Sequence, residues 1–164
     1  MIQRVQTIFL TLAAAAILTM FFYPVSSITE FTTLKTETLE TDYYHLFLTG
    51  FNDPSADSKP QMSAWTFVPI LVLTIMLLVL IIYSIFRFKN RFHQLKMVKL
   101  SIFLNILLVA GIFLNYHKFF TSVPTMIETG VGAYFLLVTL VLLVVSHRFI
   151  LKDEKLIRSA DRLR

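Results

Sequence analysis

The chain has 164 residues, of which 56% are hydrophobic and only 15% are charged, whereas soluble domains carry roughly 25% charged residues. It contains no cysteine, which excludes disulfides, thiolate metal sites and thiol nucleophiles. The net charge of +5 comes from basic residues placed beside apolar segments, so we expect no nucleic-acid binding.

Four stretches lack any charged residue: 5–29, 60–86, 100–117 and 129–147, with lengths of 25, 27, 18 and 19 residues. Because roughly 20 apolar residues cross a bilayer as a helix, the pattern predicts an all-α membrane protein. We expect a four-transmembrane-helix bundle with a small β-containing periplasmic loop between the first and second helices. The predicted pieces of this single domain (1–164) are spans at about 5–23, 66–86, 100–117 and 129–147, an outer loop at 24–65, an inner loop at 87–99, and a cytoplasmic tail at 148–164.

The first span carries small residues at every fourth position: Thr7, Thr11, Ala15 and Thr19. Such a stripe permits close helix approach and predicts a helix-packing face, which could serve the fold of the chain, a homodimer or a partner helix. A cleaved signal peptide is the alternative reading of this span. Only one arginine precedes it, and its apolar run is longer than the usual 7–15 residues, so we expect it to be retained.

The outer loop contains a threonine-rich segment at 28–41 and a second apolar run at 43–51. β-Branched and aromatic residues favour strands, so we expect the two segments to pair as a small antiparallel hairpin or sheet on the outer ends of the helices. The sequence Asn52-Asp53-Pro54 indicates a turn. A loop without regular structure is the alternative.

The inner loop is basic and contains no acidic residue; its cations are Arg87, Lys89, Arg91, Lys96 and Lys99. Aromatic residues lie between them, as they also do in nucleic-acid binders. Cations beside a membrane span attract anionic headgroups at roughly 1 kcal/mol each, so we predict contact with anionic lipid.

Asn105 is the polar residue placed deepest in the third span. An unsatisfied amide in hydrocarbon is costly, so we expect it to face another helix and pack there, with a role in permeation as the alternative. At the outer end of the fourth span, Gly130 and Gly132 predict a second site of close helix packing.

The tail is predicted to be helical, with Leu156, Ile157, Ala160 and Leu163 on one face. This apolar face could dock a partner. The alternative is a solvated extension of the fourth span.

Basic residues divide unevenly between the two sides of the predicted membrane domain. Twelve lie at the start of the chain, in the inner loop and in the tail, whereas the other two connections hold only Lys35, Lys59 and Lys118. Cytoplasmic segments collect lysine and arginine, so both termini are predicted to be cytoplasmic.

No catalytic, metal-binding or cofactor-binding motif is present, and the four histidines fall in four different segments. We therefore expect no enzyme activity, no cofactor and no metal. The leading hypothesis is an accessory or scaffold subunit of a membrane complex, with the bilayer and another membrane protein, or a second copy of the chain, as partners. The alternatives are a small channel or a solute or lipid transporter and, behind these, a membrane enzyme acting on lipid.

Two terminal segments, 1–10 and 152–164, resemble an uncharacterised family of small Bacteroidota membrane proteins, domain of unknown function 4293. Residues 88–91 with Gln94 and Leu95, and residues 130–134, also look like that family. The resemblance implies four spans, a bacterial inner membrane and an uncleaved first span. It implies no known activity, ligand or catalytic residue.

Overall fold

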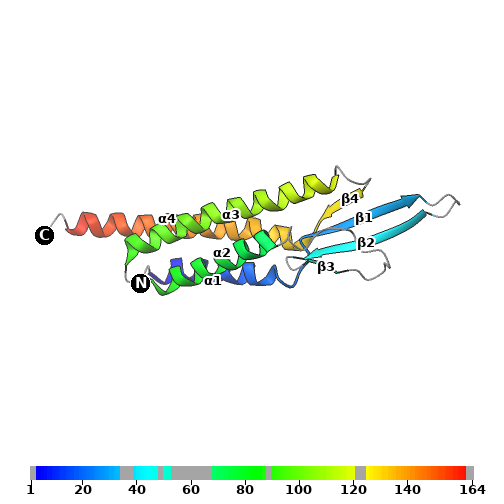
Figure 1. The fold of residues 1–164 in the computed structure, drawn as a ribbon. Helices are drawn as coiled ribbons and strands as arrows, with labels where there is room; N and C mark the ends of the chain where they lie inside the picture. The colour runs from blue at the N-terminus through cyan, green and yellow to red at the C-terminus, as the bar shows by residue number, and fades with distance from the viewer. Residues whose placement is uncertain are drawn as a thin grey trace.

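The computed structural model describes residues 3–33, 39–47, 50–52, 68–87, 90–120 and 125–161. The elements in chain order are α1 (Gln3–Thr19), β1 (Ser26–Thr33), β2 (Leu39–Phe47), β3 (Gly50–Asn52), α2 (Val68–Phe86), α3 (Arg91–Phe120), β4 (Thr125–Thr129) and α4 (Val131–Asp161). The molecule is elongated, with a helix bundle at one end and a sheet at the other (Figure 1). We call these the terminal end, where both chain termini lie, and the sheet end.

The four helices form a ring in which each packs on two neighbours. α1 contacts α2 and α4, and α3 contacts the same two helices. Neighbours in this ring run antiparallel (Figure 1). Among the described residues, three helices are long and apolar enough to cross a membrane, at Val68–Phe86, Arg91–Leu114 and Val131–Ile157, while α1 is apolar but shorter.

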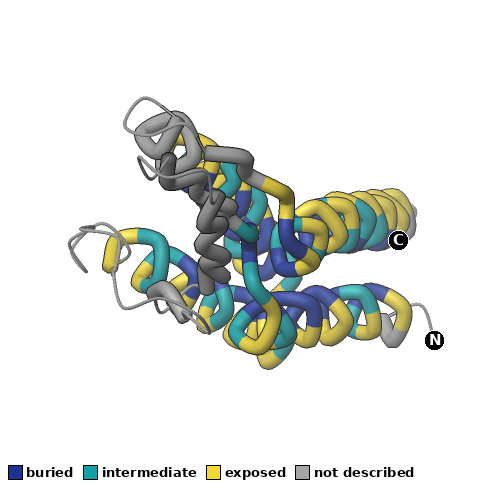
Figure 2. Tube along the Cα trace, turned by 90° about the vertical axis from the view of Figure 1, so that its right-hand side faces the viewer, coloured by how far each residue is buried: buried dark blue, intermediate teal, exposed yellow. Residues whose placement is uncertain are grey.

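Burial follows a helical repeat, so each helix has one inward stripe. In α4 the buried positions are 132, 136, 139, 143, 146, 150 and 153, which alternate steps of four and three residues. Figure 2, viewed from the sheet end, shows buried residues on the facing sides of the helices and exposed ones outside. The outward positions are themselves apolar, including Ile8, Val72, Phe103 and Val141. Such a continuous apolar exterior is typical of a membrane-embedded protein.

The first helix ends earlier than the predicted span at 5–23. After Thr19, the N–H groups of Met20, Phe21 and Phe22 each donate to the carbonyl three residues back, at 3.0–3.2 Å. These bonds extend the coil as a tighter turn. Pro24 follows, and a proline disfavours the helical conformation of the residue before it.

The predicted inner loop at 87–99 is wrong in extent. α3 begins at Arg91, so only residues 87–90 join α2 to α3. Asn90 is a favoured helix N-cap residue, and its carbonyl accepts a hydrogen bond from the Gln94 N–H at 3.0 Å. The basic residues Arg91, Lys96 and Lys99 therefore lie on the first turns of a helix that continues into the apolar segment.

The tail continues the fourth span without a break, because α4 is a single helix from Val131 to Asp161. The tail is therefore a helical extension of the fourth span, and its docking to a partner stays a prediction. At its other end α4 begins at Val131, after a strand, and not at 129.

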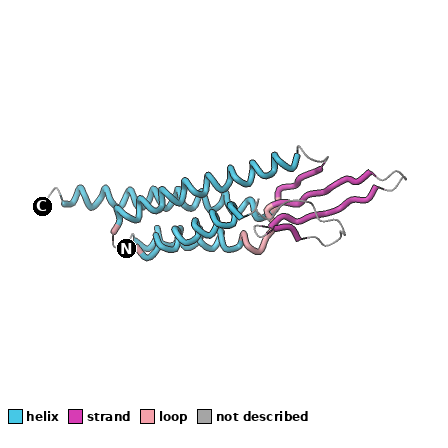
Figure 3. Tube along the Cα trace, viewed as in Figure 1, coloured by secondary structure: helices cyan, strands magenta, loops and turns pink. Residues whose placement is uncertain are grey.

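The sheet has four antiparallel strands in the order β3-β2-β1-β4 and extends away from the bundle (Figure 3). The predicted hairpin is present, with Ser26 opposite Leu46 and Thr33 opposite Leu39. The predicted segments, 28–41 and 43–51, have wrong bounds, because β2 (Leu39–Phe47) includes the end of the first segment and the start of the second. The predicted turn at 52–54 lies partly outside the described residues. β4, which pairs Ser26 with Thr129, comes from the third connection and was not predicted.

Candidate functional site

The interior of the bundle contains many polar side chains. Among the described helix residues eight are fully buried, and we call this set the polar seam: Gln6, Thr74, Ser84, Gln94, Ser101, Asn105, Thr139 and Ser146. They come from all four helices and lie on the inward stripes. Sequence analysis had identified only Asn105 among them.

Two side-chain contacts fix the level of the seam at the terminal end. Gln94 Nε2 donates to the Ser84 carbonyl at 3.2 Å, which joins α3 to the end of α2. Ser146 Oγ donates to the Gln6 carbonyl at 3.4 Å, which joins α4 to the start of α1. The Ser84 carbonyl lies in the last turn of α2, where carbonyls otherwise lack helical partners, so the Gln94 contact satisfies it.

From these contacts the helical rise places the deeper residues. Asn105 lies eleven residues beyond Gln94, and Thr74 lies ten residues before Ser84, so both are about 15–17 Å further along the bundle. Thr139 and Ala13 each lie seven residues from the Ser146–Gln6 contact. A third contact, from Arg91 Nη1 to the Asp153 carbonyl at 3.5 Å, aligns α3 with α4. Asn105 and Thr139 are each fourteen residues from this contact, so they lie at the same level along the bundle.

Asn105 is therefore at one level with Ala13, Thr74 and Thr139. The two threonine hydroxyls donate to carbonyls of their own helices, at 2.8 Å each, and keep their oxygen lone pairs. Both polar atoms of the Asn105 side chain, Nδ2 and Oδ1, are buried without a hydrogen-bond partner. The predicted placement of Asn105 toward other helices agrees with this burial, but the structure contains no interhelical bond from its amide.

The polar seam ends at the level of Asn105, and the next layer toward the sheet end is apolar. The next buried positions toward the sheet end are Ile17, Leu108 and Leu136, followed by Met20 and Ile112. These side chains contain no hydrogen-bonding group. The described bundle core thus mixes polar and apolar side chains in its layers from Gln94 to Asn105 and is apolar in the helix layers nearest the sheet.

Gln6 shares the unusual state of Asn105. Its Nε2 and Oε1 atoms are buried and have no partner, and it lies about 10 Å from the Asn105 level along the axis, so the two amides cannot bond directly. A buried polar group left unpaired costs about 1–3 kcal/mol. Two such side chains consume a sizeable fraction of a typical net stability of 5–15 kcal/mol.

Gly130 and Gly132 occupy a close contact between the start of α4 and the segment after α1. Their N–H groups donate to the carbonyls of Val25 and Pro24, both at 2.9 Å. A Cβ added at Gly132 would lie 2.8 Å from the Pro24 carbonyl oxygen, and one at Gly130 would overlap the same oxygen. The predicted helix-packing residues therefore sit at a contact that only glycine permits.

The small-residue stripe of α1 does not contribute to the bundle core in the way that its spacing suggested. Thr11 and Ala15 are exposed, and Thr7 and Thr19 are half-buried. The buried residues of α1 are Gln6, Leu10, Ala13, Ala14, Ala16 and Ile17, and the buried Met20 follows in the turn after the helix. Use of the stripe by a homodimer or partner helix stays a prediction.

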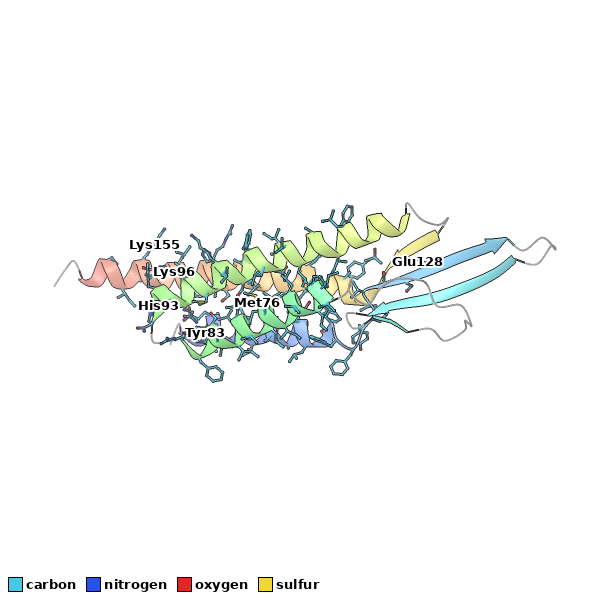
Figure 4. All side chains as sticks on the ribbon, in the orientation of Figure 1. Met76, Tyr83, His93, Lys96, Glu128 and Lys155 are labelled. Carbon is cyan, nitrogen blue, oxygen red and sulfur yellow. The ribbon has the colours of Figure 1, made fainter. Side chains whose placement is uncertain are left out.

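The predicted lipid-contact residues gather at the terminal end, apart from Lys89, which lies outside the described residues. Arg87, Lys96 and Lys99 are exposed, and Arg91 is half-buried. Lys96 Nζ lies 4.5 Å from the centre of the Phe92 ring, and the Arg87 guanidinium 5.5 Å from that of Tyr83. Figure 4 shows Lys96 and Lys155 at this end and Glu128 at the sheet end.

The predicted docking face on the tail is partly described. Leu156 is 50% exposed and Ile157 is 41% exposed, on the part of α4 that projects past the other helices (Figure 1). The side chains of Ala160 and Leu163 lie outside the described set. Within the described residues, no group of three or more histidine, aspartate and glutamate side chains could hold a metal ion.

Comparison with known proteins agrees with the resemblance in the sequence. The chain belongs to the family described as Domain of unknown function (DUF4293), whose profile matches residues 2–163. No curated protein matches the chain.

Proposed function

We propose that this DUF4293 family member is a four-span protein of the bacterial inner membrane that acts as a non-enzymatic accessory or scaffold subunit. The projecting end of α4 would dock a partner. One observation carries this proposal: α4 is longer than a membrane crossing requires and ends with exposed apolar residues.

The length of α4 supports this role. Its 31 residues extend about 46 Å, whereas the hydrocarbon core is about 30 Å thick. The Arg91–Asp153 contact marks where α3 begins, so the segment 154–161 extends about 12 Å further. Leu156 and Ile157 are apolar side chains on this extension, where a partner helix or domain could cover them.

Crosslinking tests the proposal directly. A photoreactive residue at Leu156 or Ile157 should give a covalent adduct at native expression, and one at Lys155 on the same turn serves as the matched control. Gentle detergent extraction and mass spectrometry identify the adduct. Recovery of only the monomer, with no adduct specific to positions 156 and 157, would reject the scaffold role.

Four spans and cytoplasmic termini belong to the same proposal. α1 supplies fully buried core residues, including Leu10 and Ile17, and its coil continues to Phe22, so about 28 Å of apolar helix from Val5 is available to cross the membrane. Its contribution to the core also favours retention over cleavage. The gathering of cations at the terminal end supports the cytoplasmic placement of that end and its contact with anionic headgroups.

Single cysteines test the orientation, because the chain has none of its own. Ser159→Cys should react with a membrane-impermeant maleimide only after the cells are opened. Glu128→Cys at the sheet end should react in intact spheroplasts. The reverse pattern would refute the orientation.

A small channel or solute transporter is the second candidate, and the polar seam is the observation that favours it. The apolar layers at Ile17, Leu108 and Leu136 interrupt the seam before the sheet end, so the scaffold role is preferred. Solute flux into liposomes containing the purified protein, above that of empty liposomes, would reverse this preference.

A further inference from the structure

The polar seam has a chemical requirement that its own residues do not meet. Gln6 and Asn105 each present an amide donor and an amide acceptor that have no partner, although both side chains are fully buried. They lie at different levels, so they cannot satisfy each other. Whatever partners them must donate and accept hydrogen bonds within the bundle.

The Asn105 level offers the geometry that a bound water molecule uses. By the helical rise, four polar atoms lie at this level: the two amide atoms of Asn105 and the hydroxyl oxygens of Thr74 and Thr139, whose lone pairs remain able to accept. A buried water in a protein typically makes about three hydrogen bonds to such groups. The small side chain of Ala13 at the same level limits steric crowding.

Polar groups recur along the bundle axis, although Leu10, Leu77 and Leu143 are fully buried at the level of Ser101. Each layer from the terminal end contains at least one amide or hydroxyl: first Gln94, then Gln6 with Ser146, then Ser101, then Asn105. Successive layers are three or four residues apart, or about 5 Å, which is within the span of one bridging water.

We propose that the polar seam binds a file of water molecules that enters from the terminal end and stops at the apolar layer of Ile17, Leu108 and Leu136. The seam itself contains only amides and hydroxyls, so its chemistry selects a neutral molecule that both donates and accepts hydrogen bonds. A buried acidic side chain, Asp153, lies at the terminal end, where the file enters, and its Oδ2 has no partner. The apolar layer offers no such partner. The bundle would therefore be hydrated from one side only.

Hydroxyl-radical labelling of the full-length protein in lipid nanodiscs tests this inference. Radicals produced by a short X-ray pulse oxidise the side chains nearest to bound water, and the use of ¹⁸O water reports exchange with the bulk. Four buried leucines give matched positions of one residue type. Leu10 and Leu143 lie beside the seam, and Leu108 and Leu136 lie in the apolar layer; all are at most 2% exposed.

We expect Leu10 and Leu143 to be oxidised at least tenfold faster than Leu108 and Leu136, with ¹⁸O incorporated. Asn105→Leu, in which a similarly shaped apolar side chain replaces the amide, should lower the labelling of Leu143 at least threefold. A ratio below tenfold would overturn the proposal, whether all four leucines label slowly, as in a dry bundle, or all label fast, as in a bundle that opens throughout. Unchanged labelling in Asn105→Leu would overturn the assignment of the seam's end to Asn105.

Discussion

The contact between the start of α4 and the segment after α1 gives the sharpest stability prediction. Gly130→Ala and Gly132→Ala each place a methyl group against the Pro24 carbonyl, at 2.8 Å for position 132 and closer for position 130. The neighbouring atoms are backbone, which cannot rotate out of the way as a flexible side chain can. Relief of the overlap must separate α4 from this segment and weaken the two 2.9 Å hydrogen bonds to Val25 and Pro24.

The expected loss is about 2–4 kcal/mol for either variant. Overpacking against a fixed neighbour costs typically 1–3 kcal/mol, and each strained hydrogen bond adds about 0.5–1.5 kcal/mol. For a chain of this size, a loss of 3 kcal/mol lowers the unfolding midpoint by about 6–12 °C. The midpoint is measured by circular dichroism of the detergent-solubilised protein at 222 nm, a wavelength that reports helix content.

Gly111→Ala is the matched control. It lies in α3, and an added Cβ there meets nothing within 4 Å. Alanine has a higher helix propensity than glycine by about 1 kcal/mol, so this variant should be neutral or more stable. If Gly130→Ala and Gly132→Ala melt within 2 °C of Gly111→Ala, the close contact at the sheet end of the bundle is not present in the protein.

Three further predictions concern the bundle itself, and each is checked by the same melting measurement. Leu10→Ala leaves a cavity in a fully buried site and should cost about 2–5 kcal/mol. Leu12→Ala, on the exposed apolar face, should change stability by less than about 0.5 kcal/mol. Equal effects of the two substitutions would contradict the assigned inward face of α1. Ile150→Asp buries a carboxylate and should cost more than about 3 kcal/mol. Ile157→Asp, on the projecting end of α4, should leave the melting midpoint within about 2 °C of the wild-type value. A large loss of stability in Ile157→Asp would mean that this end of α4 packs within the chain. Gln94→Leu removes the donor to the Ser84 carbonyl and should cost about 1 kcal/mol; no change would show that this bond does not hold α2 to α3.

The sequence predicts the helices well and their connections poorly. Charge-free segments mark helices because charged side chains are expelled from hydrocarbon, and α2, α3 and α4 all contain their predicted spans apart from the first two positions of 66–86 and of 129–147. The connection 87–99 was misread because a charged, basic segment looks like a loop. Helix formation does not require apolar residues, and α3 continues through Lys96 and Lys99 as an ordinary polar helix end.

The strand β4 could not be found from local pattern. Its five residues, Thr125–Thr129, are too few to show alternation, and they form a strand only because β1 offers a partner edge about 100 residues earlier in the chain. The same limit applies to the stripe at Thr7, Thr11, Ala15 and Thr19. Spacing shows that these residues share a face, but not whether that face meets a helix or lipid.

By itself the sequence determined two features: apolar helices able to cross a membrane, and cations gathered in particular segments. Both features follow from the solvation of individual side chains. Only the tertiary structure decided which faces meet. It showed that the inward stripes of four helices bring Gln6, Gln94, Asn105, Thr139 and Ser146 into one seam. In a helix whose outward side is also apolar, the inward side is not marked by hydrophobicity, so its location depends on the packing of the neighbouring helices.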